Sequence, residues 1–374
     1  MAFAAHIFAL FVVAATLLPL LPTRSRWLRS GDFPRLQIAV LLLIAIAGLI
    51  LTGPATRAGI ILITLCLICL AIQARYIVPY TRLVRVESAR ARNCPERRRV
   101  RVMVANVLMD NRNDEALLAE VRRHDPDIFL ALETDQWWVD RIETLADSLP
   151  HVAARPLDNY YGMVMRSKLA LSEVRFRNLL QDGVPSLKVT VRFPDGRPFV
   201  FYGVHPPPPP LQDTLQRDAE LLIVGRQASN AGLPALVAGD LNDVGWSSTT
   251  RLLRRTTNLL DPRIGRGMFS TFNANSRLMR WPLDHIFHTP EFALVELHQG
   301  GYVGLDHLPI VADLCLMSAP VAGHDSIEQR PGDSETVAET IHDGLAGDRK
   351  APAFLESRGV ATPARPVPAA PPEG

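Results

Sequence analysis

The first part of the chain is mostly apolar, and three uncharged runs stand out within it. They cover residues 3–22, 36–52 and 58–74, and arginines lie between them and after the last one. A run of about 20 apolar residues crosses a hydrocarbon core of about 30 Å as a helix. The pattern therefore predicts three transmembrane helices in a membrane region of residues 1–76. A signal peptide is the competing interpretation of the first run, but it lacks a basic leader and a small-residue cleavage site.

Arginines are distributed unevenly around these three runs. The connection between the second and third runs has only Arg57, whereas the first connection and the segment after residue 74 are rich in arginine. Since arginine is retained on the cytoplasmic side, this bias predicts an external N-terminus and a cytoplasmic domain after residue 75, at an inner or plasma membrane. Residues 77–98 read as a basic juxtamembrane linker, either a plain stop-transfer flank or a segment that lies on anionic headgroups.

Residues 99–317 have the pattern of a soluble α/β (α+β) domain, in which short apolar strands alternate with helices. The pattern predicts strands over residues 100–107, 127–132, 162–165, 187–193, 198–204, 235–238, 283–288 and 305–316. It predicts helices over residues 111–123, 214–229 and 247–253.

Two proline-rich stretches depart from this pattern. Residues 318–374 have too little apolar surface to offset the entropy of ordering, so we expect a disordered tail. Residues 206–210 are consecutive prolines, which cannot join a strand ladder and form a stiff extended loop. This loop is either a wall beside a site or a polyproline ligand for a binding module.

Charge and cysteine content restrict the function less than the strand pattern does. The net charge is only +2, so no global polycation indicates a nucleic acid partner. The four cysteines show no disulfide spacing, and the CxxC pair Cys66 and Cys69 lies inside the third apolar run as packing. Cysteine content therefore leaves the compartment open, with a slight preference for a reducing one.

Candidate chemistry gathers at the ends of the predicted strands. The run PALVAGDLND at residues 234–243 is an apolar strand that delivers Asp240, Asn242 and Asp243 at its tip. Such a tip is also typical of a turn with local side-chain hydrogen bonds. Other predicted strands carry further polar residues at or near their ends, namely Asn106, Glu133, His205, Asp284, Asp306 and His307. Taken singly, Asn106 is also explained as a turn cap and Asp284 as a surface charge.

Most of these residues offer hard oxygen donors. Asn106, Glu133, Asp240, Asn242 and Asp306 suit Mg²⁺ or Mn²⁺, whereas a zinc site would take more histidines or cysteines. Hydrolysis of a phosphate ester requires a metal, a base for water, a group that steadies the phosphoryl oxygens and relief of charge on the leaving oxygen. The set contains candidates for all four.

The order of these motifs resembles that of the endonuclease/exonuclease/phosphatase superfamily, in a membrane-anchored, bacterial-type member. The matching motifs are NV at 106–107, LALET at 130–134, VH at 204–205, GDLND at 239–243, PLDHIF at 282–287 and LDHLPI at 305–310. The resemblance covers residues 99–317. It implies a DNase I-like sandwich of two sheets flanked by helices. It also implies a Mg²⁺- or Mn²⁺-dependent phosphoric ester hydrolase in which water attacks phosphorus in line.

The resemblance implies a role for each motif residue on the metal side. Glu133 is then the main metal ligand, Asn106 lies beside it and Asp306 completes this side of the site. The implied cofactor is Mg²⁺ or Mn²⁺.

The remaining motif residues are implied to carry the chemistry at phosphorus. Asp240 and Asn242 contact the attacked phosphate and the nucleophile, and His205 holds a phosphoryl oxygen or acts as an acid. His307 is the general base or a phosphate ligand. Asp284 orients His307 and raises its basicity.

Three departures from the family pattern concern substrate contacts and packing. Arg166 and Ser167 stand in the reverse of the usual Ser-Arg order, which puts a substrate role for them in doubt. Leu241 replaces an aromatic residue, and Leu305 stands where serine is common.

Two questions stay open from the sequence. The substrate is a nucleic acid, a phospholipid or an inositol phosphate, and three spans with a basic linker favour the lipid by position alone. The alternative to an enzyme is a non-catalytic membrane scaffold that uses the proline-rich loop and tail for partner binding.

Overall fold

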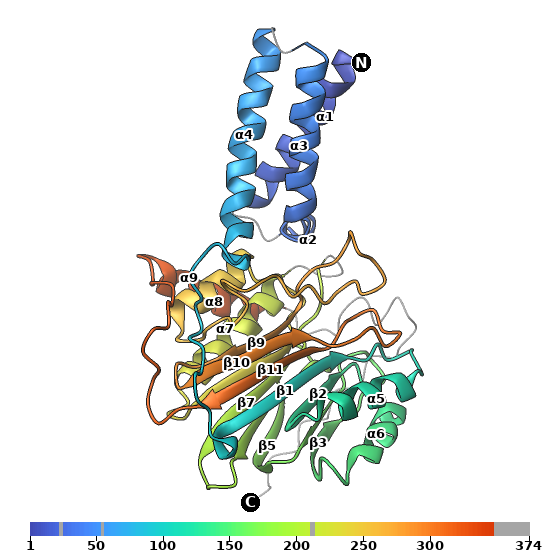
Figure 1. Cartoon of the computed structure of the whole chain (residues 1–374), viewed down its shortest axis with the longest axis vertical. Helices are drawn as coiled ribbons and strands as arrows, with labels where there is room; N and C mark the ends of the chain where they lie inside the picture. Colours follow the sequence, from blue (N-terminus) through green and yellow to red (C-terminus); the bar gives the residue numbers. More distant parts are fainter. Residues whose placement is uncertain (22–24, 54–55, 210–213, 348–374) are drawn as a thin grey trace, which may run out of the picture.

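The computed structural model describes residues 1–21, 25–53, 56–209 and 214–347, which form an apolar helical bundle and a two-sheet domain (Figure 1). The bundle contains α1 (Ala2–Leu17), α3 (Arg35–Leu51) and α4 (Arg57–Ile77). A short helix, α2 (Arg26–Ser30), lies between α1 and α3. The bundle has its own apolar core, in which Val12, Leu42 and Cys66 are fully buried. Cys66 and Cys69 therefore pack as the sequence predicts.

The prediction of three transmembrane helices is corrected to two candidates. Among the described residues, only residues 2–20 and 57–80, runs of 19 and 24 residues, are long and apolar enough to span a membrane. Helix α3 has 17 residues, which at 1.5 Å per residue gives about 26 Å against a hydrocarbon core of about 30 Å. Length and composition of these two helices are weak indications of membrane association, because a signal sequence or a soluble core helix has the same properties.

The soluble domain is a sandwich of two sheets. The first sheet has the strand order β10-β11-β1-β2-β4-β3 and the second has the order β5-β6-β7-β8-β9. The strands of the first sheet are β1 (Arg99–Asn106), β2 (Ile128–Leu132), β3 (His151–Arg155), β4 (Met163–Ser167), β10 (Phe292–Gln299) and β11 (Ile310–Leu316). Those of the second are β5 (Ala170–Asn178), β6 (Pro185–Arg192), β7 (Pro198–Val204), β8 (Ala235–Asp240) and β9 (Asp284–His288).

Helices cover the outer faces of both sheets. They are α5 (Asp114–His124) and α6 (Gln136–Ile142) beside the first sheet and α7 (Leu215–Ser229), α8 (Ser248–Thr256) and α9 (Asp333–Ala346) beside the second. Short 3₁₀ turns occur at Leu18–Leu20, Val78–Tyr80, Glu96–Arg98 and Glu143–Leu145. The predicted two-sheet sandwich flanked by helices is confirmed.

The alternation of side chains along the strands explains why each sheet packs an apolar face against the other sheet and an apolar face against helices. In β1, Val102 and Val104 point into the core between the sheets, whereas Met103 and Ala105 pack under the helices of the first sheet. Successive side chains of a strand point to opposite faces, so a strand covered on both sides is apolar throughout.

Two parallel strand pairs bring the polar strand ends together. Strand β1 pairs in parallel with β2 and ends at Asn106 opposite Leu132, so Glu133 follows next to Asn106. Strand β7 pairs in parallel with β8, which places His205 beside the end of β8 at Asp240. Strand β9 begins at Asp284 directly opposite Asp240. Ligand sites form at such carboxyl ends of parallel strands.

The segment predicted as a linker packs tightly on the soluble domain. The Ala91 amide donates to the Leu294 carbonyl over 2.8 Å, and Ser88 Oγ lies 2.7 Å from His288 Nε2. Glu87 is buried and pairs with Arg254. Residues 77–98 therefore extend the edge of the soluble domain, and the bundle is held close to it.

The prediction of a disordered tail over residues 318–374 is corrected in part. Residues 333–346 form α9, which packs on α7 through Val337, Ile341 and Gly344. Apolar residues four apart line one side of a helix, and this short apolar side is hidden in the polar average of the tail. Arg255 also pairs with Asp333 over 2.7 Å. Residues 348–374 lie outside the described residues.

The expectation of no disulfide is wrong. Cys94 and Cys315 are bonded, with their Cα atoms 5.8 Å apart and a sequence separation of 221. Residue spacing gave no signal, because the pairing depends on β11 lying beside the segment that leads into β1. A disulfide persists in an oxidising compartment and is rare in the cytosol, so this bond opposes the slight preference for a reducing compartment.

We expect the purified protein, with its thiols blocked at lysis and then denatured without reductant, to have two alkylated cysteines, Cys66 and Cys69. Reduction before alkylation raises the number to four, and mass spectrometry counts the adducts. The Cys94→Ser variant is the control, because it frees Cys315 and gives three adducts without reductant. Four adducts without reductant in the wild-type protein would contradict the bond.

Candidate active site

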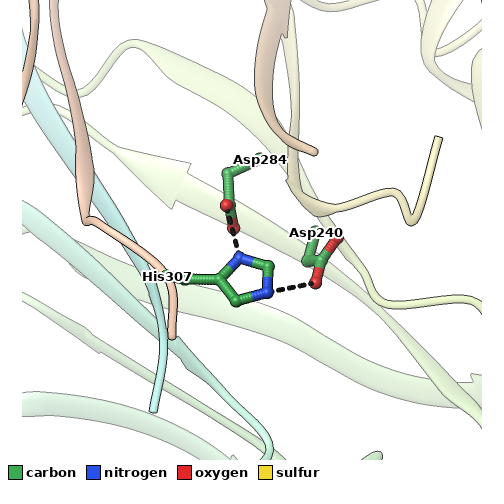
Figure 2. Close-up of side chains that lie close together, drawn as sticks. All are labelled: Asp240, Asp284 and His307. Atoms are coloured by element: carbon green, nitrogen blue, oxygen red, sulfur yellow. Dashed lines mark hydrogen bonds and ion pairs between the residues drawn. The ribbon is translucent and has the colours of Figure 1, made fainter. Parts of the chain in front are cut away.

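A chain of three buried ionisable groups forms the centre of the site (Figure 2). His307 Nδ1 lies 2.8 Å from Asp284 Oδ2, and His307 Nε2 lies 3.5 Å from Asp240 Oδ2. Burial alone would lower the pKa of His307, but the two carboxylates raise it to about 10. Burial acts to raise the pKa of Asp240, yet His307 and His205 hold it below its usual range. In Asp284, burial prevails and the pKa is raised.

Two contacts hold Asp240 and His307 in this arrangement. Asp240 Oδ1 accepts from the Asn242 amide over 2.9 Å, and the backbone of Asn242 has a φ of +49°. The Phe272 ring lies 4.8 Å from the His307 ring and limits its rotation. The imidazole is therefore held in one orientation, with Nδ1 directed at Asp284.

A second group of polar residues lies on the other side of Asp240. Asn106 Nδ2 donates to Glu133 Oε1 over 2.8 Å and to Asp240 Oδ2 over 3.2 Å. Burial, with Asp306 and Asp240 nearby, raises the pKa of Glu133 to about 7. Glu133 has a φ of +61°, a left-handed conformation that a non-glycine residue adopts at a cost and that is often found at functional sites.

These residues fit a divalent cation. Asp306 Oδ1 is buried without a hydrogen-bond partner, and burial raises the pKa of this carboxyl. Glu133, Asp240 and Asp306 line one cavity of about 640 Å³, and no arginine or lysine is among its described lining residues. The positive charge of His307 is directed at Asp284 and Asp240. Glu133 and Asp306, on the other side of the cluster, would therefore be stabilised by a metal ion with oxygen ligands.

The three residues of Figure 2 offer a different place for an ion. Ligand atoms of Asp240, Asp284 and His307 lie within 4.8 Å of one another. However, His307 already lies between the two carboxylates, and a protonated imidazole supplies the positive charge that they require. We therefore favour the side of Glu133, Asn106 and Asp306 for the metal, as the sequence predicts.

His205 and Asn242 complete the floor of the cavity. His205 Nε2 lies 3.9 Å from Glu133 Oε1 and 3.8 Å from Asp240 Oδ2, and its Nδ1 has no partner. Burial lowers the pKa of His205 to about 4, so the ring is neutral at pH 7. Asn242 Nδ2 donates to the Pro206 carbonyl over 3.0 Å. All eight predicted site residues thus lie in one region of the domain.

Other residues noted in the motifs have structural partners. Asp243 accepts from Ser247 and from Thr250 Oγ1, so it holds Ser247, the residue that caps the start of α8. Arg166 donates to the Leu149 carbonyl over 3.1 Å and pairs with Glu143, which accounts for its guanidinium without a substrate. Ser167 Oγ accepts from the Leu169 amide.

The aromatic walls of the cavity were not predicted from the sequence. Tyr161 packs against His205 with ring centroids 5.3 Å apart, and Phe272 packs against both His307 and Trp281. Phe33 reaches the cavity from the connection between α2 and α3. Of the predicted proline loop, Pro208 and Pro209 line the cavity, which favours the wall over the polyproline ligand; residues 210–213 lie outside the described residues.

Comparison with known proteins agrees with this fold. A model of the Endonuclease/Exonuclease/phosphatase family matches residues 103–307. No curated protein matches the chain.

Solved structures share the fold at low identity. Humanized D. rerio TDP2 is 17% identical with a TM-score of 0.50, over 58% of this chain and 98% of that one. The human Nocturnin catalytic domain with bound sulfate is 16% identical with a TM-score of 0.49, over 60% and 96%. An endonuclease/exonuclease/phosphatase from Beutenbergia cavernae is 22% identical with a TM-score of 0.48, over 60% and 73%. The first of these likenesses shows a DNase I-like fold.

Proposed function

The chain belongs to the Endonuclease/Exonuclease/phosphatase family, and on that premise we propose that it is a Mg²⁺- or Mn²⁺-dependent hydrolase of phosphate esters. The observation that carries this proposal is the hydrogen-bonded pair of Asp284 and His307 facing a buried carboxylate cluster across Asp240. A base held by a carboxylate beside an anionic metal site is the arrangement that water attack on phosphorus requires.

Glu133, Asn106 and Asp306 hold the metal in this proposal. A divalent ion held there would supply positive charge that offsets the negative charge of the phosphate. Since burial raises the pKa of Glu133 to about 7, a bound cation also favours the ionised carboxylate.

His307 acts as the base in this proposal. In the form of the enzyme in which His307 has lost its Nε2 proton, the water oxygen forms the new bond to phosphorus, the opposite phosphorus–oxygen ester bond breaks, and one water proton passes to His307 Nε2. The leaving oxygen takes up a proton, so one water is consumed per ester. Asp284 holds the ring through Nδ1 and stabilises the imidazolium that forms.

His205 and Asn242 position the phosphate in this proposal. A pKa of about 4 keeps His205 neutral, which suits a hydrogen bond to a phosphoryl oxygen better than proton donation as an acid. The Asn242 amide group lies beside Asp240, where it contacts the nucleophile.

The non-catalytic scaffold is the weaker alternative. A scaffold has no use for Glu133 and Asp306, two carboxylates that line a cavity with no arginine or lysine among its described lining residues and that a bound cation would stabilise. The proline-rich loop, moreover, faces the cavity with Pro208 and Pro209.

We also propose that the chain is associated with a membrane. Residues 1–76 then form the membrane region, residues 77–98 join it to a catalytic domain of residues 99–317, and the tail follows. The cytoplasmic orientation predicted from the arginines stays a prediction, and the Cys94–Cys315 bond favours the opposite side.

The proposed function is tested by assaying the purified full chain in detergent on a panel of phosphate esters. We expect hydrolysis with Mg²⁺ or Mn²⁺ and at least a 100-fold loss with a chelator, restored by adding back the ion. The panel contains plasmid DNA, RNA, sphingomyelin, phosphoinositides and a nitrophenyl phosphate diester. Failure to cleave any of these with either ion would refute the function.

A further inference from the structure

The walls of the active-site cavity are apolar and aromatic. The polar floor carries the carboxylates and histidines, whereas the walls contain Phe33, Pro34, Tyr160, Phe272, Met279 and Trp281. Large apolar walls around a few polar groups bind a ligand whose reacting end is polar and whose remainder is apolar.

The same walls do not suit a polyanion. Nucleic acids and inositol polyphosphates carry phosphates beyond the one that reacts, and proteins bind these extra phosphates with arginine and lysine. None of the described residues that line this cavity is an arginine or a lysine. The cavity therefore suits a substrate with one phosphate group and an apolar substituent.

One wall of the cavity belongs to the apolar bundle. Phe33 and Pro34 immediately precede α3, and the Phe33 ring packs edge-on against Trp281 with centroids 6.0 Å apart. Trp246 Nε1 donates to the Asp32 carbonyl over 2.7 Å, which fixes this connection on the soluble domain. Figure 1 shows that the bundle stands on one end of the sandwich, and the residues that line the cavity come from both parts.

The rim of the cavity is apolar and exposed next to α3. Leu278 is 82% exposed and Met279 is 47% exposed. The Leu278 carbonyl accepts from Gln37 Nε2 over 2.6 Å, which places this rim at the first turn of α3. The first turn of α3 lies in the bundle beside the two candidate spans, α1 and α4, so in a membrane-bound protein these exposed apolar residues reach the boundary between headgroups and acyl chains.

We propose that the substrate is a lipid phosphate ester, which enters the cavity from the membrane with its phosphate at the polar floor and its apolar chain along the wall of Phe33, Met279 and Trp281. This inference rests on the proposed function. It names the apolar chain as the feature of the substrate that the cavity selects.

The test compares two nitrophenyl phosphate diesters that differ only in their second substituent, a hexadecyl or a methyl group. Full-length protein and Mg²⁺ are present in the same detergent micelles, and nitrophenol release is followed. A matched pair of monoesters, hexadecyl phosphate and ethyl phosphate, is assayed by release of inorganic phosphate. We expect kcat/KM to be about 100-fold higher for the hexadecyl ester, because several methylenes are buried on binding.

Wall variants separate binding in the cavity from simple enrichment in micelles. Phe33→Ala and Met279→Ala are expected to lower the ratio of hexadecyl to methyl kcat/KM by about tenfold, mainly through KM. Met279 is half exposed, so its truncation leaves folding intact even where Phe33→Ala does not. Val152→Ala, at a 47% exposed position on the edge strand β3, is the control and keeps the wild-type ratio.

The outcomes are distinguishable. Hydrolysis of the methyl and hexadecyl esters at equal rates, or a preference for single-stranded DNA or an inositol polyphosphate, overturns the lipid inference and leaves the hydrolase in place. A hexadecyl preference that neither wall variant changes also overturns it, because enrichment in micelles then explains the ratio. Absence of hydrolysis across all substrates refutes the proposed function itself.

Discussion

Replacement of His307 by alanine is expected to lower kcat for phosphate ester hydrolysis by about 1,000-fold, which is typical of the loss of a positioned general base. His307 is buried, bonded to Asp284 and 3.5 Å from Asp240, so no neighbouring group can take over its place. The assay is metal-dependent hydrolysis under saturating substrate. His342→Ala is the matched control, because that side chain is 80% exposed on α9 and should leave kcat unchanged. Activity within a few-fold of wild type in His307→Ala would exclude His307 as the base.

The pH profile of Asp284→Asn separates two roles for His307. Asp284 is a main cause of the raised pKa of His307, so its neutralisation lowers that pKa. If His307 must be neutral to accept a proton, the acidic limb of kcat/KM moves to lower pH, and the plateau falls about 100-fold. If His307 instead acts as a protonated phosphate ligand, the alkaline limb moves to lower pH. An unchanged profile would mean that Asp284 has no electrostatic part in the reaction.

The polar residues of the site could be predicted because the ends of buried strands can be recognised in a sequence. Apolar runs that stop at Asn106, Glu133 and Asp240 mark the ends of buried strands, and the parallel pairs bring those ends to one edge. Asp284 could be predicted for a related reason, because it begins the strand that pairs with the end of β8. Each of these site residues could therefore be predicted from the local apolar pattern and from the order of the motifs.

The walls of the site could not be predicted in the same way. Phe33 lies in the apolar N-terminal region, and only the packing of the bundle against Trp281 brings it to the cavity. The Cys94–Cys315 bond and the docking of α9 on α7 also depend on contacts between segments far apart in the chain. Average composition hid the α9 helix, and run length alone overcounted the membrane helices.

Glu133→Gln is expected to abolish metal-dependent hydrolysis and, without metal, to stabilise the protein at alkaline pH. Burial raises the pKa of Glu133 from 4.5 to about 7, so the folded state favours the protonated carboxyl. The stabilisation from this protonation is fully present below pH 4.5 and is lost as the pH rises through about 7. At pH 8 the ionised side chain therefore costs the metal-free protein about 3 kcal/mol, which a neutral glutamine of the same shape does not.

Metal reverses this order of stability, because a cation compensates the ionised carboxylate. We expect Mg²⁺ or Mn²⁺ to raise the Tm of the wild-type protein at pH 8 but not that of Glu133→Gln, and calorimetry to detect binding only in the wild type. Below pH 7 the ion must displace a proton from Glu133, so its apparent affinity falls up to tenfold per pH unit. Glu115→Gln, at an exposed position on α5, is the control and keeps wild-type metal binding. If Glu133→Gln bound the ion as tightly as the wild type, the ion would lie elsewhere, and the three residues around His307 would be its remaining place.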